Sequence, residues 1–253
     1  MPAVSRLTIT PVKGLALVDR DEVELTPSGV PENRRFFLVD ERGKKLSGLR
    51  DGPLYGVKAL TDADGSRLRL ELPDGRALDE PVELGERTWA AFWDRPVRGN
   101  VVEGPFAGAL SELLGAPVRL VRADDPGGAV DDSPVSLLSE ASLEELARRS
   151  GEHAVDGRRF RMLVHVAGTH PHEEDEWLGR EVRVGDAVVR LTKQDARCRM
   201  TTRNPDTGIK DFDTLQAIKG YRGLRDGKKI DFGVYGDVVR PGRIRVGDAV
   251  EPL

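Results

Sequence analysis

The chain begins with a series of short segments in which apolar and polar residues alternate. Such alternation is typical of half-buried strands, and here Gly, Pro and Asp turns, such as those at 64–65 and 73–75, separate the segments. We therefore predict that the first part of the chain is built mainly of strands. The predicted strands lie at 6–10, 22–25, 36–39, 67–72, 95–98 and 117–122.

Helical spacing of apolar residues interrupts this pattern at three places. Apolar residues within 105–114 fall on one face of a helix, and Gly115 follows as a stop signal. Residues 139–149 begin with serines that can cap a first turn and end with arginines, so they predict a second helix. A third, short helix is predicted over 213–221.

A polar, glycine-bearing loop at 123–132 divides the chain into two regions. We predict an all-β first domain over 1–122, and a second domain over 123–253 that forms a β-barrel or strongly curved sheet with helices packed outside. The fold class is therefore mainly β with flanking helices (α+β). The hexapeptide Arg-Val-Gly-Asp-Ala-Val occurs at 183–188 and at 245–250, and we predict a hairpin turn at each.

Composition narrows the class of protein. With 253 residues, 38% of them hydrophobic, the chain can bury a core, and its net charge of −4 offers no basic excess for a nucleic-acid partner. No apolar run reaches the roughly 18 residues of a membrane span, and the first residues do not resemble a signal peptide. These observations predict a cytoplasmic protein with no membrane and no nucleic-acid partner.

The single cysteine, Cys198, is the strongest candidate for chemistry. It lies between Arg197 and Arg199, and neighbouring positive charge favours the thiolate, which is the form that a soft metal or an electrophile needs. In an extended chain, residues 198, 200 and 202 would share one face before a turn at 204–208. The alternative is that Cys198 is a small buried hydrophobe.

One cysteine also sets limits on redox chemistry. A protein-held iron–sulfur cluster takes about four thiolates, so this chain cannot hold one alone. Electrons for any redox reaction would have to arrive from another protein or from a diffusible donor.

Histidines offer a weaker candidate site. The segment 170–175 holds His170 and His172 beside acidic residues and could bind a metal, but a solvated loop is the better interpretation. His165 lies in an apolar strand and is expected to be a core histidine.

The cysteine segment also carries a family resemblance. Arg-Cys-x-x-Thr-Thr-x-x-Pro-Asp-Thr-Gly at 197–208 closely resembles the cysteine motif of MOSC domain proteins, the group that includes the amidoxime-reducing molybdenum enzymes. Further short matches follow in the order of that family. They lie at 11–14, 33–37, 132–134, 138–143, 160–161, 172–177, 184–186 and 232–235.

The resemblance implies an N-terminal β-barrel domain followed by a MOSC β-barrel domain. It also implies a molybdenum cofactor (molybdopterin) whose metal is held by the Cys198 thiolate, the reduction of small N-hydroxylated substrates, and a separate electron-donor protein carrying flavin, haem or an iron–sulfur cluster. The residues that it implicates in cofactor binding are Lys13, Gly14, Arg35, Asp132, Ser133, Arg161, Arg197, Cys198 and Tyr235.

Some positions depart from the family pattern. Gly14 stands where a serine is usual, and Leu163 where relatives have asparagine. Asp195 stands where many relatives have the first cysteine of Cys-x-x-Cys, and Ala196 lacks a serine-like hydroxyl. Two other functions therefore stay open. The chain could carry the cofactor, or a persulfide on Cys198, without turnover, or it could be a cofactor-free binding module.

Overall fold

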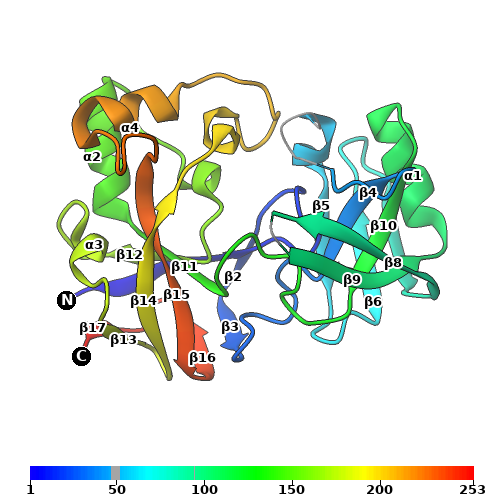
Figure 1. The fold of residues 1–253 in the computed structure, drawn as a ribbon, viewed down its shortest axis with the longest axis horizontal. Helices are drawn as coiled ribbons and strands as arrows, with labels where there is room; N and C mark the ends of the chain where they lie inside the picture. Colours follow the sequence, from blue (N-terminus) through cyan, green and yellow to red (C-terminus); the bar gives the residue numbers. More distant parts are fainter. Residues whose placement is uncertain (47–51, 94) are drawn as a thin grey trace.

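The structure is a computed structural model that describes residues 1–46, 52–93 and 95–253 (Figure 1). Most of its regular elements are strands. They are β1 (Ala3–Ile9), β2 (Val18–Arg20), β3 (Glu22–Leu25), β4 (Phe36–Asp40), β5 (Lys58–Thr61), β6 (Arg67–Glu71), β7 (Ala77–Pro81), β8 (Leu84–Phe92), β9 (Arg95–Val102), β10 (Val118–Ala123), β11 (Val135–Ser139), β12 (Val164–Ala167), β13 (Glu181–Val184), β14 (Ala187–Ala196), β15 (Asp231–Arg240), β16 (Gly242–Arg245) and β17 (Val250–Pro252). The helices are α1 (Pro105–Leu114), α2 (Glu140–Ser150), α3 (Glu173–Glu176), α4 (Thr214–Arg222) and the 3-10 turns η1 (Gly52–Gly56), η2 (Gly157–Phe160) and η3 (Arg199–Thr202).

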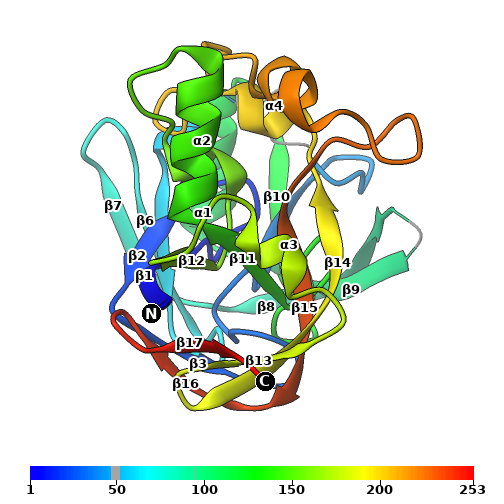
Figure 2. The same cartoon turned by 90° about the vertical axis from the view of Figure 1, so that its left-hand side faces the viewer.

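The largest sheet has eight strands in the order β17-β13-β14-β15-β11-β12-β1-β2. Its alternating apolar residues, from Leu7 on β1 to Val234 on β15, form one continuous core. A second apolar cluster, which includes Leu146 of α2 and Ile218 of α4, packs these helices against the end of the same region (Figure 2).

A four-stranded sheet, β4-β10-β9-β8, and a three-stranded sheet, β5-β6-β7, form the other half of the molecule, on the right in Figure 1. Phe36 of β4 and Phe106 of α1 are fully buried in the core between these elements. Pro105 starts α1 at a position where the missing N–H costs nothing, and Gly115 ends it at φ 65°.

Strands from the start of the chain pair with strands that follow the polar loop 123–132. The first strand, β1, pairs with β12, and β3 pairs with β16 near the other end of the chain. The first 25 residues thus add strands to sheets of the second region, and the predicted division at 122/123 stays a prediction.

The prediction of a mainly β fold with a few flanking helices is confirmed. In the described part of the chain no sheet closes into a barrel, because each ends in two edge strands. The hairpin predicted at 183–188 joins β13 to β14, but the one predicted at 245–250 is wrong, since that segment connects β16 and β17, which belong to different sheets. Among the described residues, no helix is long and apolar enough to cross a membrane.

Candidate functional site

Cys198 lies directly after the end of β14. The extended segment stops at Ala196, which pairs with Asp231, and Cys198 becomes the cap of the 3-10 turn η3. The prediction of a strand that continues through residue 202 is therefore wrong. Thr201 donates its backbone N–H and its hydroxyl to the Cys198 carbonyl at 3.2 and 3.1 Å, whereas the cysteine side chain makes no capping hydrogen bond. The thiol is exposed, so the alternative of a buried cysteine is excluded.

The predicted turn after this segment is present and fixes η3 against the rest of the molecule. The Asn204 side-chain oxygen accepts from the backbone N–H of Asp206 at 2.9 Å, as expected for an Asx turn. Gly208 has φ 68°, and a Cβ there would lie 2.7 Å from Cα of Gly52. Glycine is therefore required where the two halves of the molecule meet.

The thiol opens into a cavity of about 380 Å³ that is lined from both halves of the chain. The first half contributes the loops after β1 and before β4, and the second contributes η2, the end of β14 and β15. Of the residues predicted for the site, those that line the cavity are Lys13, Gly14, Asp132, Ser133, Arg161, Arg197, Cys198 and Tyr235.

Two guanidinium groups in this lining form no ion pair with any of the described residues. Arg161 donates to the Leu15 carbonyl at 2.7 Å, and Arg34 donates to the Arg161 carbonyl at 3.3 Å, but neither forms an ion pair with any described acidic side chain. Burial and then the charge of Arg34 lower the pKa of Arg161 to about 10, so it is still protonated at pH 7. The cavity wall thus holds positive charge that an anion would neutralise.

Backbone strain gathers at the same place. Arg34 and Arg161 have φ values of 53° and 55°, and Trp93, which also lines the cavity, has 54°. Only His172 and Asp226 share this left-handed conformation among the other described non-glycine residues. Residues other than glycine rarely adopt this backbone conformation, and such strain is typical of binding and catalytic sites.

Lys13 and Asp131 form an ion pair at the cavity wall. The ammonium lies 2.7 Å from the Asp131 carboxylate and donates to the Ala129 carbonyl at 3.0 Å. Burial lowers the pKa of Lys13 to about 7 in spite of this partner. Burial acts in the opposite direction on Asp131, but Lys13 and Arg34 outweigh it and hold the pKa of Asp131 at about 2.

A second ion pair, Asp195 with Arg197, lies beneath the cysteine. Both side chains are almost fully buried, and the guanidinium also contacts the Phe160 carbonyl. Burial raises the pKa of Asp195, with Arg197 and then the Tyr235 hydroxyl acting against that rise. Arg197 therefore anchors the end of β14 rather than facing the thiol as an unpaired charge.

Arg35 does not line the cavity. Its guanidinium donates to the carbonyls of Asp64 and Asp124 at 3.2 and 3.3 Å. The neighbouring Arg34 lines the cavity where Arg35 was expected. The pattern of two successive arginines could not distinguish them. Leu163 also lies away from the cavity, in the core of the large sheet.

The remaining predicted features have structural roles. His165 is buried and lies 3.4 Å from Glu140, as expected for a core histidine. His172 packs near Tyr221 with 3.2 Å between Nε2 and the hydroxyl, and burial lowers its pKa to about 4. The described residues contain no cluster of three or more His, Cys, Asp or Glu side chains able to hold a metal ion.

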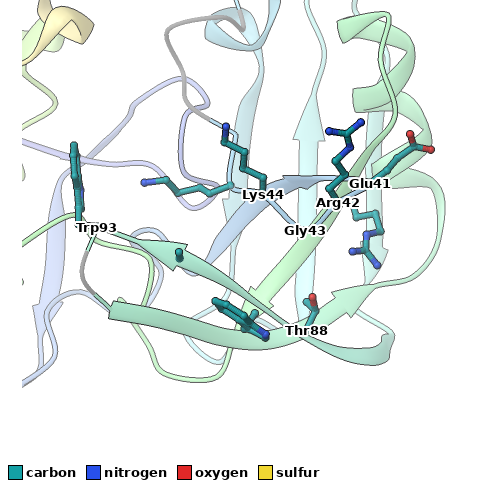
Figure 3. Close-up of a pocket in the computed structure, with 10 residues that line it drawn as sticks. Glu41, Arg42, Gly43, Lys44, Thr88 and Trp93 are labelled. Carbon is teal, nitrogen blue, oxygen red and sulfur yellow. The ribbon is translucent and has the colours of Figure 1, made fainter.

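A wider groove of about 750 Å³ lies on the first half of the chain (Figure 3). It is lined by the hairpin after β4 and by β8, and it contains no cysteine. Two of its residues, Lys45 and Trp93, line the smaller cavity as well.

Comparisons with known proteins agree over almost the whole chain. The family model of the MOSC N-terminal beta barrel domain matches residues 1–117, and that of the MOSC domain matches residues 124–251. The chain is 31% identical to mitochondrial amidoxime-reducing component 1 of Homo sapiens, over 98% of this chain and 82% of that protein. It is 40% identical to the protein of the same name from Mus musculus, over 98% of this chain and 81% of that protein. It is also 26% identical to molybdenum cofactor sulfurase of Caenorhabditis briggsae, over 99% of this chain but 35% of that protein.

Proposed function

Because the chain belongs to the family of MOSC domain proteins that carry a MOSC N-terminal β-barrel domain, we propose that it binds the molybdenum cofactor through Cys198 and reduces N-hydroxylated compounds. The observation that carries the proposal is one cavity that joins an exposed thiol to two arginines that form no ion pair with any described residue. Relatives named amidoxime-reducing components support the choice of reaction.

The residues of the cavity fit this cofactor. A thiolate is a suitable ligand for a soft, sulfur-ligated metal, and the Cys198 side chain is free to provide it. Arg34 and Arg161 would hold the phosphate of the pterin, because each has donors that no acidic side chain uses. Gly14, with φ 94°, leaves the wall open beside Lys13.

When bound, the cofactor would supply a metal centre that exchanges two electrons beside the N–O bond of the substrate. The overall reaction consumes two electrons and two protons, breaks the N–O bond and releases water. Lys13 can hold or release a proton at Nζ near neutral pH, since its pKa is about 7. The Asp195–Arg197 pair would fix the chain that presents Cys198.

Metal analysis of the purified protein tests the proposal. We expect molybdenum and an oxidised pterin fluorescence signal in the wild type, and loss of both in Cys198→Ser. Arg199→Ser is the matched control, because Arg199 is the next residue and is exposed but does not line the cavity. Chemically reduced wild type should convert a simple amidoxime to the amidine. The proposal is wrong if Cys198→Ser retains molybdenum and activity.

The exposed position of Cys198 also favours a second candidate, a carrier of the cofactor or of a persulfide. The molybdenum cofactor sulfurase among the relatives is consistent with it. A mass increase of one sulfur atom on Cys198, in protein free of molybdenum and without amidoxime turnover, would support the carrier over the reductase.

A further inference from the structure

We propose that the groove between the hairpin after β4 and strand β8 is the docking surface for a small acidic redox protein that delivers electrons to the cavity. This inference rests on the proposed reductase function. We call this surface the β8 groove. Its basic and aromatic lining side chains are Arg42, Lys44, Lys45, Trp89, Trp93 and Arg119.

Among the described residues, four basic side chains and one acidic side chain, Glu41, line the β8 groove. Arg42 and Lys44 are exposed, and their side chains form no ion pair with any acidic residue in the described ranges. Lys45 lies 4.4 Å from the Phe92 ring centroid and 5.5 Å from that of Trp93. Its charge also acts on Asp131, but the two side chains form no ion pair. Arg119 is paired with Glu86. An acidic partner would complement this surface.

Two exposed tryptophans occupy the same groove. Trp89 is 60% exposed and Trp93 is 76% exposed, large fractions for side chains that are usually buried. Tryptophan and arginine are enriched in the residues that dominate protein interfaces. The two exposed tryptophans beside exposed basic side chains therefore indicate a surface that contacts another protein.

The β8 groove adjoins the cavity that contains Cys198. Trp93 and Lys45 line both spaces. The Trp93 indole N–H also donates to the Asp131 carboxylate at 3.3 Å, and Asp131 pairs with Lys13 in the cavity wall. Figure 3 shows Trp93 apart from Glu41, Arg42 and Thr88, at the left side of the groove. A redox protein seated here would bring its electron-carrying group close to the mouth of the cavity.

The reaction needs such a donor. With one cysteine the chain cannot hold an iron–sulfur cluster to store electrons. Two one-electron donations from the reduced partner, with two protons from solvent, convert an N-hydroxyl group to N–H and water, and the partner is oxidised. Single-stranded nucleic acid could also meet aromatic and basic residues, but it would deliver no electrons to the cavity.

Binding is measured first, with an acidic flavodoxin as the probe and the fluorescence of the exposed tryptophans as the signal. We expect saturable binding at low salt that weakens at least 10-fold between 20 and 200 mM salt. The double variant Arg42→Glu/Lys44→Glu should weaken it at least 10-fold, and Trp89→Ala should weaken it several-fold as measured by calorimetry. None of these three residues lines the cavity.

Lys219→Glu/Lys228→Glu is the matched control, since it adds the same negative charge at exposed lysines on and after α4, far from β8 in Figure 1. It should change flavodoxin affinity less than twofold. The docking proposal is overturned if flavodoxin does not bind, if both double variants behave alike, or if a single-stranded oligonucleotide binds as tightly as flavodoxin.

Turnover then distinguishes this proposal from the proposed function. Loaded wild type should reduce an amidoxime with reduced flavodoxin and with a chemical reductant, whereas Arg42→Glu/Lys44→Glu should lose about 10-fold in kcat/KM with flavodoxin only. Failure of the wild type with both donors overturns the reductase, while the binding results still decide whether the β8 groove is an acidic-protein site. Equal turnover of wild type and variant with flavodoxin overturns the docking site alone.

Discussion

The buried Asp195–Arg197 pair allows a sharp test of how the chain holds its cysteine. The two side chains are 6% and 7% exposed, so removing one leaves the other almost fully buried and without its ion-pair partner. Breaking such a pair costs about 3–5 kcal/mol, because an uncompensated charge stays buried. We therefore expect Arg197→Met to lower the free energy of unfolding by that amount. For a chain of this size the melting temperature should fall by about 6–20 °C.

The destabilisation of Arg197→Met should grow with pH. Burial raises the folded-state pKa of Asp195 above its ordinary value, and removal of Arg197 takes away a group that opposes that rise. Between the unfolded and folded pKa values the folded state binds more protons than the unfolded state, so stability present at low pH is lost as pH rises. The variant should consequently be closer to wild type at pH 4 than at pH 8.

Denaturant unfolding at both pH values, followed by circular dichroism, measures the effect. The double variant Asp195→Leu/Arg197→Met should regain most of the lost stability, because a well-packed apolar pair often replaces a buried ion pair without loss. If Arg197→Met unfolds within about 0.5 kcal/mol of wild type, a difference typical of surface substitutions, the pair does not anchor β14 as described.

Two further outcomes follow from the cavity, and a third follows from the close approach of Gly208 to Gly52. Arg161→Met should abolish binding of pyrophosphate in calorimetry. The same variant should gain about 1 kcal/mol in free energy of unfolding, and so melt slightly higher, because a half-buried cation that forms no ion pair is removed. A loss of stability would contradict this reasoning. Pyrophosphate affinity of the wild type should fall about 10-fold from pH 6 to pH 8.5, as Lys13 loses its proton near pH 7, and Lys13→Met should show no such fall. Gly208→Ala should cost about 2–4 kcal/mol in denaturant unfolding, since its Cβ would lie 2.7 Å from Cα of Gly52, whereas Gly227→Ala, with a similar φ of 69° and open space, should cost only about 1–2 kcal/mol.

Local patterns predicted much of the fold. The helices at 105–114 and 139–149 form as expected because their caps and apolar faces lie within the segments themselves. The family predicted from the motif at 197–208 is confirmed. Long-range pairing was not predictable in this way: nothing within 3–9 reveals that this strand pairs with 164–167. A cytoplasmic location stays a prediction, and the curated relatives at 31% and 40% identity are named as mitochondrial.

The candidate site was predictable in its chemistry but not in all its partners. The thiol and Lys13 belong to short motifs, so the sequence pointed to them directly. The choice between Arg34 and Arg35 depends on one backbone conformation, φ 53° at Arg34, which places one side chain in the cavity and the other over Asp64 and Asp124. Trp93 lies in a turn between two strands and belongs to no motif, so only the folded structure reveals that it lines the cavity.

Charge and strain in the cavity wall lead to one physical interpretation. Arg34 and Arg161 each adopt a left-handed conformation that costs about 1–3 kcal/mol, and each then holds a cation without an acidic partner. Both features destabilise the protein without a ligand. The hydrogen bond to the Leu15 carbonyl does not need a cation, because a neutral polar side chain at position 161 could donate it as well. An anion seated between them would offset both costs. The cavity is therefore organised for a negatively charged ligand beside an exposed thiol, which is the combination that a phosphorylated, metal-bearing cofactor presents.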